Sequence, residues 1–147
     1  MLKNYQLQAG PVSLVFQPER LFMRYLKIGG TEILRGVYAA LRDRHWGTPA
    51  PVISAFKAAV KKDSFNISFK ADWKVKDIDY RGRARLEGKK DGTITFNFEG
   101  TAHSQFIKNR IGFCILHGHN CAGQPYQLQL ILWRDLKEEA KEKKAVS

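Results

Sequence analysis

The sequence has little cysteine and no long apolar run. Two cysteines among 147 residues are too few for a disulfide framework, so we expect a reducing, cytoplasmic location. No apolar stretch approaches the roughly 20 residues that a membrane-spanning helix needs. The first residues, MLKNYQLQAGPVSLVF, lack the small-residue cleavage site of a secretion signal. These absences predict a protein that is neither secreted nor inserted in a membrane.

Acidic residues are also scarce. The chain has 14 Asp and Glu against 25 Lys and Arg, a formal net charge of +11 with a pI near 9.8. Residues 57 to 90 concentrate this excess, which would attract an anionic ligand or form a solvated sheet face, and the second interpretation is favoured. With 44% hydrophobic and 12% aromatic residues, the chain has enough apolar material for one domain with a core.

What the chain does have is strict alternation of apolar and polar residues. In residues 65–75 and 78–87 every second residue is apolar or small, which is the pattern of half-buried strands. KKDG, residues 89 to 92, supplies turn residues before the pattern resumes in residues 93–100, which predicts a hairpin. Residues 31–46 fit either a strand or a helical stripe, and residues 52–62 fit a short helix or an edge strand.

Many short strands with few helices predict an all-β protein, an antiparallel β-sandwich with at most one or two short helices. We expect one sandwich domain over residues 1–133, with a last alternating segment at Tyr126, Leu128, Leu130 and Leu132. Residues 134–147 form a charged C-terminal tail with almost no apolar stripe, so we expect a frayed helix or disorder there.

Two histidines and two cysteines lie close together in RIGFCILHGHNCAG, residues 110 to 123. If RIGFCILH is a strand, Cys114 and His117 point to opposite faces, so a zinc site that needs convergent ligands is not expected. We therefore predict no metal and no cofactor, and we interpret Cys114 as a small buried apolar residue. A disulfide between Cys114 and Cys121 requires the chain to fold back sharply.

A second cluster, RDRHWG at residues 42 to 47, is suited to binding a carboxylate or polyol. Guanidinium groups bind carboxylates through paired hydrogen bonds, and an aromatic face packs on a sugar ring. The alternative is structural: Asp43 pairs with a neighbouring arginine and Trp46 plugs the end of the sandwich. The predicted ligand-binding residues are Arg42, Arg44, His45 and Trp46, together with His119 at the end of the predicted strand.

Three segments carry a family resemblance: YLKIGGTEILRGVYAALRDRHWGTPAPVIS, DGTITFNFEG and KNRIGFCILHGHNCAGQP. Over roughly residues 9 to 125 the chain resembles the N-terminal β-domain of bacterial D-apionate lactonases and related proteins, which are longer chains with a TIM-barrel region after the β-domain. The resemblance implies that residues 31–46 are strand. It also implies a link to sugar-lactone or carbohydrate metabolism.

Three functional hypotheses remain open. The first is an accessory or binding domain for a carbohydrate or sugar acid, which acts as a homodimer or with a separately encoded barrel protein. The second is a small lactonase in which His117 is the base and Arg110 and Arg44 stabilise the oxyanion or carboxylate. The third and weakest is nucleic-acid binding by a basic sheet face that comprises Lys70, Lys74, Arg81, Arg83 and Arg85.

Overall fold

The computed structural model describes residues 1–127, and these residues confirm the all-β prediction. They form nine strands and two 3₁₀ turns. The strands are β1 (Tyr5–Ala9), β2 (Val12–Gln17), β3 (Phe22–Ile28), β4 (Thr31–Asp43), β5 (Val52–Val60), β6 (Phe65–Val75), β7 (Ile78–Gly88), β8 (Ile94–Ala102) and β9 (Lys108–Leu116). The 3₁₀ turns are η1 (Pro18–Arg20) and η2 (His119–Cys121).

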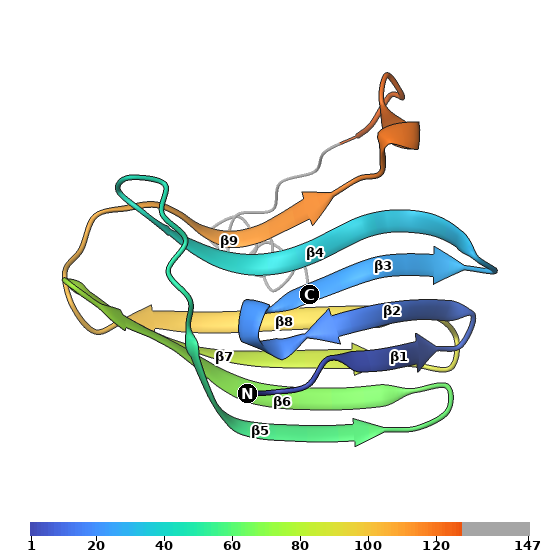
Figure 1. Cartoon of the computed structure of the whole chain (residues 1–147), viewed down its shortest axis with the longest axis horizontal. Helices are drawn as coiled ribbons and strands as arrows, with labels where there is room; N and C mark the ends of the chain where they lie inside the picture. Colours follow the sequence, from blue (N-terminus) through green and yellow to red (C-terminus); the bar gives the residue numbers. More distant parts are fainter. Residues whose placement is uncertain (128–147) are drawn as a thin grey trace, which may run out of the picture.

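The strands form two antiparallel sheets that pack as a sandwich (Figure 1). The first sheet has the order β1-β2-β3-β4-β9, and the second has the order β5-β6-β7-β8. The chain passes from the first sheet to the second through residues 44–51 and returns through residues 103–107. Both connections and the β6–β7 turn lie at the same end of the molecule, on the left in Figure 1. We call this the crossover end.

The core lies between the sheets and is built from the alternating residues of facing strands. On β6 the predicted inward residues are buried from Phe65 to Trp73, and Phe16 of β2 packs on Phe69 with ring centroids 5.9 Å apart. Each fully buried side chain of this size contributes about 1.5–3 kcal/mol. Val75 is the exception to the predicted alternation: it is 39% exposed because it lies at the crossover end, beside the β6–β7 turn.

Two ambiguous segments are strands. Residues 31–43 form β4, which is paired on both sides, with β3 and with β9, so neighbouring backbones satisfy its hydrogen bonds and override the helical stripe. Residues 52–60 form β5, an edge strand of the second sheet with a bulge near Ala55, whose φ is +50°. The predicted β7–β8 hairpin is confirmed, and Gly29 and Gly30, both with positive φ, form the turn between β3 and β4.

Gly10 joins the two sheets at the end opposite the crossovers. Its φ is +50°, and a Cβ at this position would collide with the carbonyl oxygen of Lys90 in the β7–β8 turn. The Gly10 amide also donates to the carbonyl of Asp63 in the β5–β6 turn, at 2.9 Å. Only glycine allows three turns to approach this closely.

Some expectations lie outside the described residues. They concern the alternation at Leu128, Leu130 and Leu132, the domain boundary at residue 133 and the tail at residues 134–147. Within residues 1–127, no helix has the length and apolar character needed to cross a membrane.

Candidate functional site

The predicted site residues fall into two groups at opposite ends of β9 (Figure 1). Strand residues are about 3.3 Å apart, so the seven positions from Arg110 to His117 amount to roughly 23 Å. His117 and Arg110 therefore do not share one reaction centre within this chain, and their catalytic roles stay predictions. The group at the crossover end comprises Arg42, Arg44, His45, Trp46 and Arg110; the other group comprises His117 and His119.

At the far end of β9, the two cysteines are free thiols, so the disulfide alternative is wrong. Side chains alternate along β9 as predicted: Phe113 contacts Phe96 with ring centroids 5.1 Å apart, while the next residue, Cys114, points the other way. Cys114 is half-buried rather than buried, because the outer surface of the first sheet leaves it partly accessible. Among residues 1–127, no cluster of three or more His, Cys, Asp or Glu side chains could hold a metal ion.

At the crossover end, Asp43 builds a tight turn that presents the residues after it to solvent. One carboxylate oxygen of Asp43 accepts hydrogen bonds from the amides of His45, at 2.9 Å, and Gly47, at 2.8 Å. The Trp46 amide donates to the Asp43 carbonyl at 3.1 Å, and Trp46 has a left-handed φ of +65°. Asp43 thus caps its own turn instead of pairing with arginine. Trp46 is 61% exposed and does not plug the sandwich.

This turn forms one side of a hollow of about 510 Å³ at the crossover end, which we call the crossover hollow. Its volume lies in the range that holds small ligands. The turn contributes Arg44 and His45, and the opposite side comes from Lys76 and Asp77 in the β6–β7 turn. The hollow therefore combines two cationic side chains with an imidazole and two carboxylates, those of Asp43 and Asp77. Its apolar wall comprises Pro49, Val75, Ile78 and Ile107.

Arg42 has a different place. Its side chain does not line the crossover hollow; it donates to the Tyr38 hydroxyl at 2.9 Å and to the Thr48 hydroxyl at 3.0 Å. Because Thr48 lines the hollow, Arg42 positions the wall rather than facing a ligand there. Arg110 lies directly opposite Arg42 on β9, outside the hollow as well.

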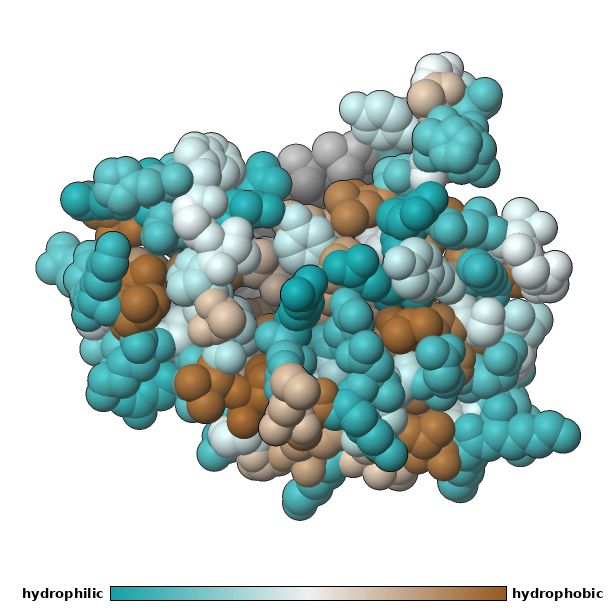
Figure 2. Space-filling view, in the orientation of Figure 1, coloured by the Kyte–Doolittle hydropathy of each residue, from teal (hydrophilic) through white to brown (hydrophobic). Residues whose placement is uncertain are grey.

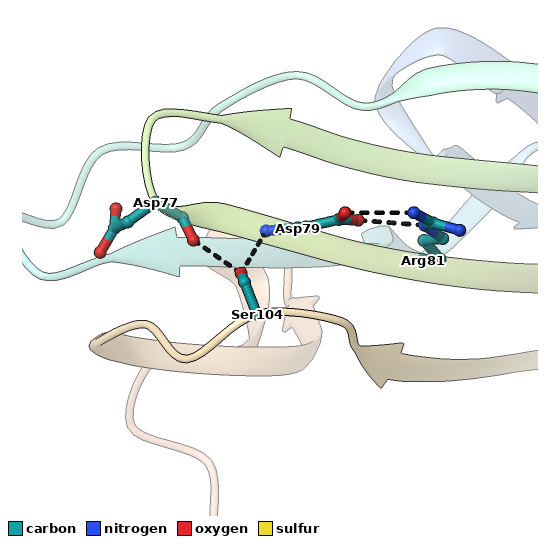
Figure 3. Close-up of polar contacts among 4 residues, drawn as sticks. All are labelled: Asp77, Asp79, Arg81 and Ser104. Carbon is teal, nitrogen blue, oxygen red and sulfur yellow. Dashed lines mark hydrogen bonds and ion pairs between the residues drawn. The ribbon is translucent and has the colours of Figure 1, made fainter.

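A polar network holds the other wall in place (Figure 3). The Ser104 hydroxyl donates to the Asp77 carbonyl at 2.6 Å and accepts the Asp79 amide at 2.9 Å, which ties the β8–β9 connection to the β6–β7 turn. The Asp79 carboxylate accepts two hydrogen bonds from Arg81, at 3.0 and 3.1 Å. These hydrogen bonds lower the pKa of Asp79 below its usual value and raise the pKa of Arg81.

The core supports the wall from inside. Trp73 is 1% exposed, and its indole N–H donates to the Pro49 carbonyl at 2.9 Å. Figure 2, in the orientation of Figure 1, shows hydrophobic patches separated by hydrophilic residues, including patches at the crossover end on the left. A partly apolar hollow with a charged rim is the usual form of a site for a small polar ligand.

Sequence reasoning missed the second half of the hollow. Lys76 and Asp77 are the two residues between the alternating segments of β6 and β7, so a tight turn there was readable from the pattern. The sequence does not predict the contact between that turn and residues 44–49, because this contact depends on how the two sheets pack.

Two facing antiparallel sheets with a ligand-sized hollow at one end define an all-β sandwich domain with a candidate small-molecule site. The chain belongs to the family of D-apionate lactonase N-terminal domains, whose family model matches residues 2–131. This confirms the resemblance seen in the sequence.

One relative is the D-apionate lactonase of Brucella anthropi, which is 32% identical over 133 residues. The alignment covers 86% of this chain and 21% of that protein, so the chain spans about a fifth of the length of its relative. No solved structure matches this chain.

Proposed function

We propose that this chain is an accessory domain that binds a sugar acid or sugar lactone in carbohydrate metabolism. The observation that carries the proposal is the crossover hollow, where Arg44 and Lys76 approach an apolar wall from two separate turns. The Arg44 guanidinium and the Lys76 ammonium group would bind the carboxylate, or the carbonyl of the lactone. The aliphatic wall would pack against the C–H face of the ligand.

The name of the relative supports the ligand class. That protein is called a lactonase of D-apionate, and the matched region is the N-terminal domain of the family. A domain of this kind that holds the carboxylate would raise the local concentration of substrate for a catalytic partner. We infer that the partner is a separate barrel protein or a second copy of this chain.

The lactonase alternative has less support from the geometry. The predicted base, His117, follows the end of β9 that lies away from Arg44 and Arg110. An oxyanion donor has to lie about 3 Å from the reacting oxygen, so these three residues cannot act together within one chain.

Titration calorimetry with D-apionate and D-gluconate tests the proposal, with xylitol as the neutral polyol. We expect binding of both sugar acids and weaker or no binding of xylitol. Arg44→Gln and Lys76→Gln should each weaken binding at least about tenfold, the value of one lost charged hydrogen bond.

The matched control is Lys62→Gln, which removes the same charge from the β5–β6 turn at the other end of the sandwich. Equal affinity of the wild type and the Arg44 variant, or an equal loss in the Lys62 variant, would show that the crossover hollow is not the site. Sedimentation velocity with the purified chain then decides between a homodimer and a chain that needs another partner.

A further inference from the structure

A second hollow lies on the outer face of the second sheet. Its volume is about 620 Å³, it shares no lining residue with the crossover hollow, and β6, β7 and β8 together with His103 form it. Its charged lining residues are Lys70, Asp72, Arg81, Arg83, Glu99 and His103. We call this the sheet hollow.

Two like charges face each other inside the sheet hollow. Lys70 on β6 and Arg83 on β7 are direct partners in the antiparallel register, and both side chains point outward. Like charges directly opposite each other destabilise a sheet. Among residues 1–127, no carboxylate oxygen lies within 4.0 Å of the charged nitrogens of either side chain.

The neighbouring arginines of β7 are neutralised, unlike Arg83. Arg81 is held by two hydrogen bonds from its guanidinium to Asp79, and Arg85 pairs with Glu87 at 3.5 Å. Arg83 also has Glu99 as its direct partner on β8, but among residues 1–127 these two side chains form no ion pair within 4.0 Å, so no close carboxylate reduces the repulsion between Lys70 and Arg83. A bound anion with high charge density would offset it.

The frame around the sheet hollow is fixed. The amide of His103 donates to the Asp79 carbonyl at 2.7 Å, and Asp79 in turn fixes the Arg81 guanidinium. The Thr101 hydroxyl also lines the hollow. Donors of three kinds, an ammonium, guanidinium groups and a hydroxyl, thus surround a space that is already formed, an arrangement that suits the oxygens of a phosphate group.

We infer that the sheet hollow binds the phosphate group of a small molecule, with Lys70 and Arg83 on either side of the anion. Asp72 and Glu99 also line the hollow as the direct strand partners of Arg81 and Arg83, and their carboxylates would accept hydrogen bonds from hydroxyl groups of the ligand. These carboxylates repel a long polyanion. The aromatic rings of β6, such as Phe69 and Trp73, are buried on the other face, so bases could not stack on them as in single-strand nucleic-acid binding.

The experiment is an NMR titration of the full chain at constant ionic strength with inorganic phosphate, glycerol 3-phosphate and glycerol. We expect saturable shifts of amides around the sheet hollow with both phosphates and none with glycerol. Tighter binding of glycerol 3-phosphate than of inorganic phosphate identifies a phosphorylated polyol as the ligand class. Equal binding identifies free phosphate. Binding of glycerol alone, or no saturable shift with either phosphate, overturns the inference.

Variants locate the site. Arg83→Gln and Lys70→Gln should each weaken phosphate binding at least tenfold. Arg85→Gln, the matched control two residues along the same face of β7, should stay within twofold of the wild type. Equal loss in the Arg83 and Arg85 variants would refute the site, as would a single-stranded oligonucleotide that binds where phosphate does not. Arg44→Gln should leave phosphate binding unchanged, which separates this test from that of the crossover hollow.

Discussion

Trp73 links the hydrophobic core to the wall of the crossover hollow, and its replacement by phenylalanine tests that link. The indole N–H donates to the Pro49 carbonyl at 2.9 Å, and the side chain is 1% exposed. Losing the hydrogen bond costs about 1 kcal/mol. The smaller ring leaves a void that costs about 1–2 kcal/mol more. We expect Trp73→Phe to lower the free energy of unfolding by about 2–3 kcal/mol and the Tm by roughly 6–12 °C.

Thermal and urea unfolding followed by circular dichroism measures this loss. Phe69→Leu is the control, because Phe69 is 3% exposed on the same face of β6 but makes no hydrogen bond to the crossover end. Only Trp73→Phe should also weaken sugar-acid binding, since Pro49 lines the hollow. A loss in Trp73→Phe below about 0.5 kcal/mol, or an equal loss of binding in both variants, would refute the link between core and wall.

Three further predictions follow from particular residues. Gly10→Ala should lower the free energy of unfolding in urea by at least about 1 kcal/mol more than Gly29→Ala. Both glycines have left-handed φ, but only at Gly10 would the added Cβ collide with backbone atoms. Equal losses in the two variants would contradict this. The hydrogen bonds from Arg81 lower the pKa of Asp79 in the folded state. Ionised Asp79 therefore stabilises the folded chain above pH 3.8, the ordinary pKa, and this stabilisation is lost as the pH falls through the lowered pKa of the folded state. In Asp79→Asn, the free energy of unfolding should therefore fall less steeply with decreasing pH than in the control Asp77→Asn. Identical pH dependence in the two variants would count against the Asp79–Arg81 ion pair. His117→Ala should leave sugar-acid affinity within twofold, since His117 follows the end of β9 and does not line the crossover hollow; a tenfold loss in calorimetry would support its predicted role.

The faces of β6 and β7 were predictable because a side-chain period of two needs no knowledge of neighbours. Phe65 to Trp73 are buried as expected, and the prediction failed at Val75, where the strand reaches the crossover end. The strand at residues 31–43 could not be decided from its own pattern. The pairing of β4 with β3 and β9 decided it, although the family resemblance pointed the same way.

Only the part of the candidate site in residues 44–49 was predictable from the sequence. The sequence pointed to Arg44 and His45 because a guanidinium, an imidazole and an indole follow one another in a turn between strands. It also suggested a joint role for His117 and Arg110. The extended conformation of β9 separates these two residues, since each strand position adds about 3.3 Å.

Local chemistry in the sequence by itself determined the strand faces, the turn that begins at Lys89, and the all-β class, because these depend on side-chain alternation and backbone preferences. Only the tertiary structure decided that Lys76 meets Arg44 across a hollow. These residues belong to turns that connect different strands, and their approach depends on how the two sheets pack, which the alternation of a single strand does not specify.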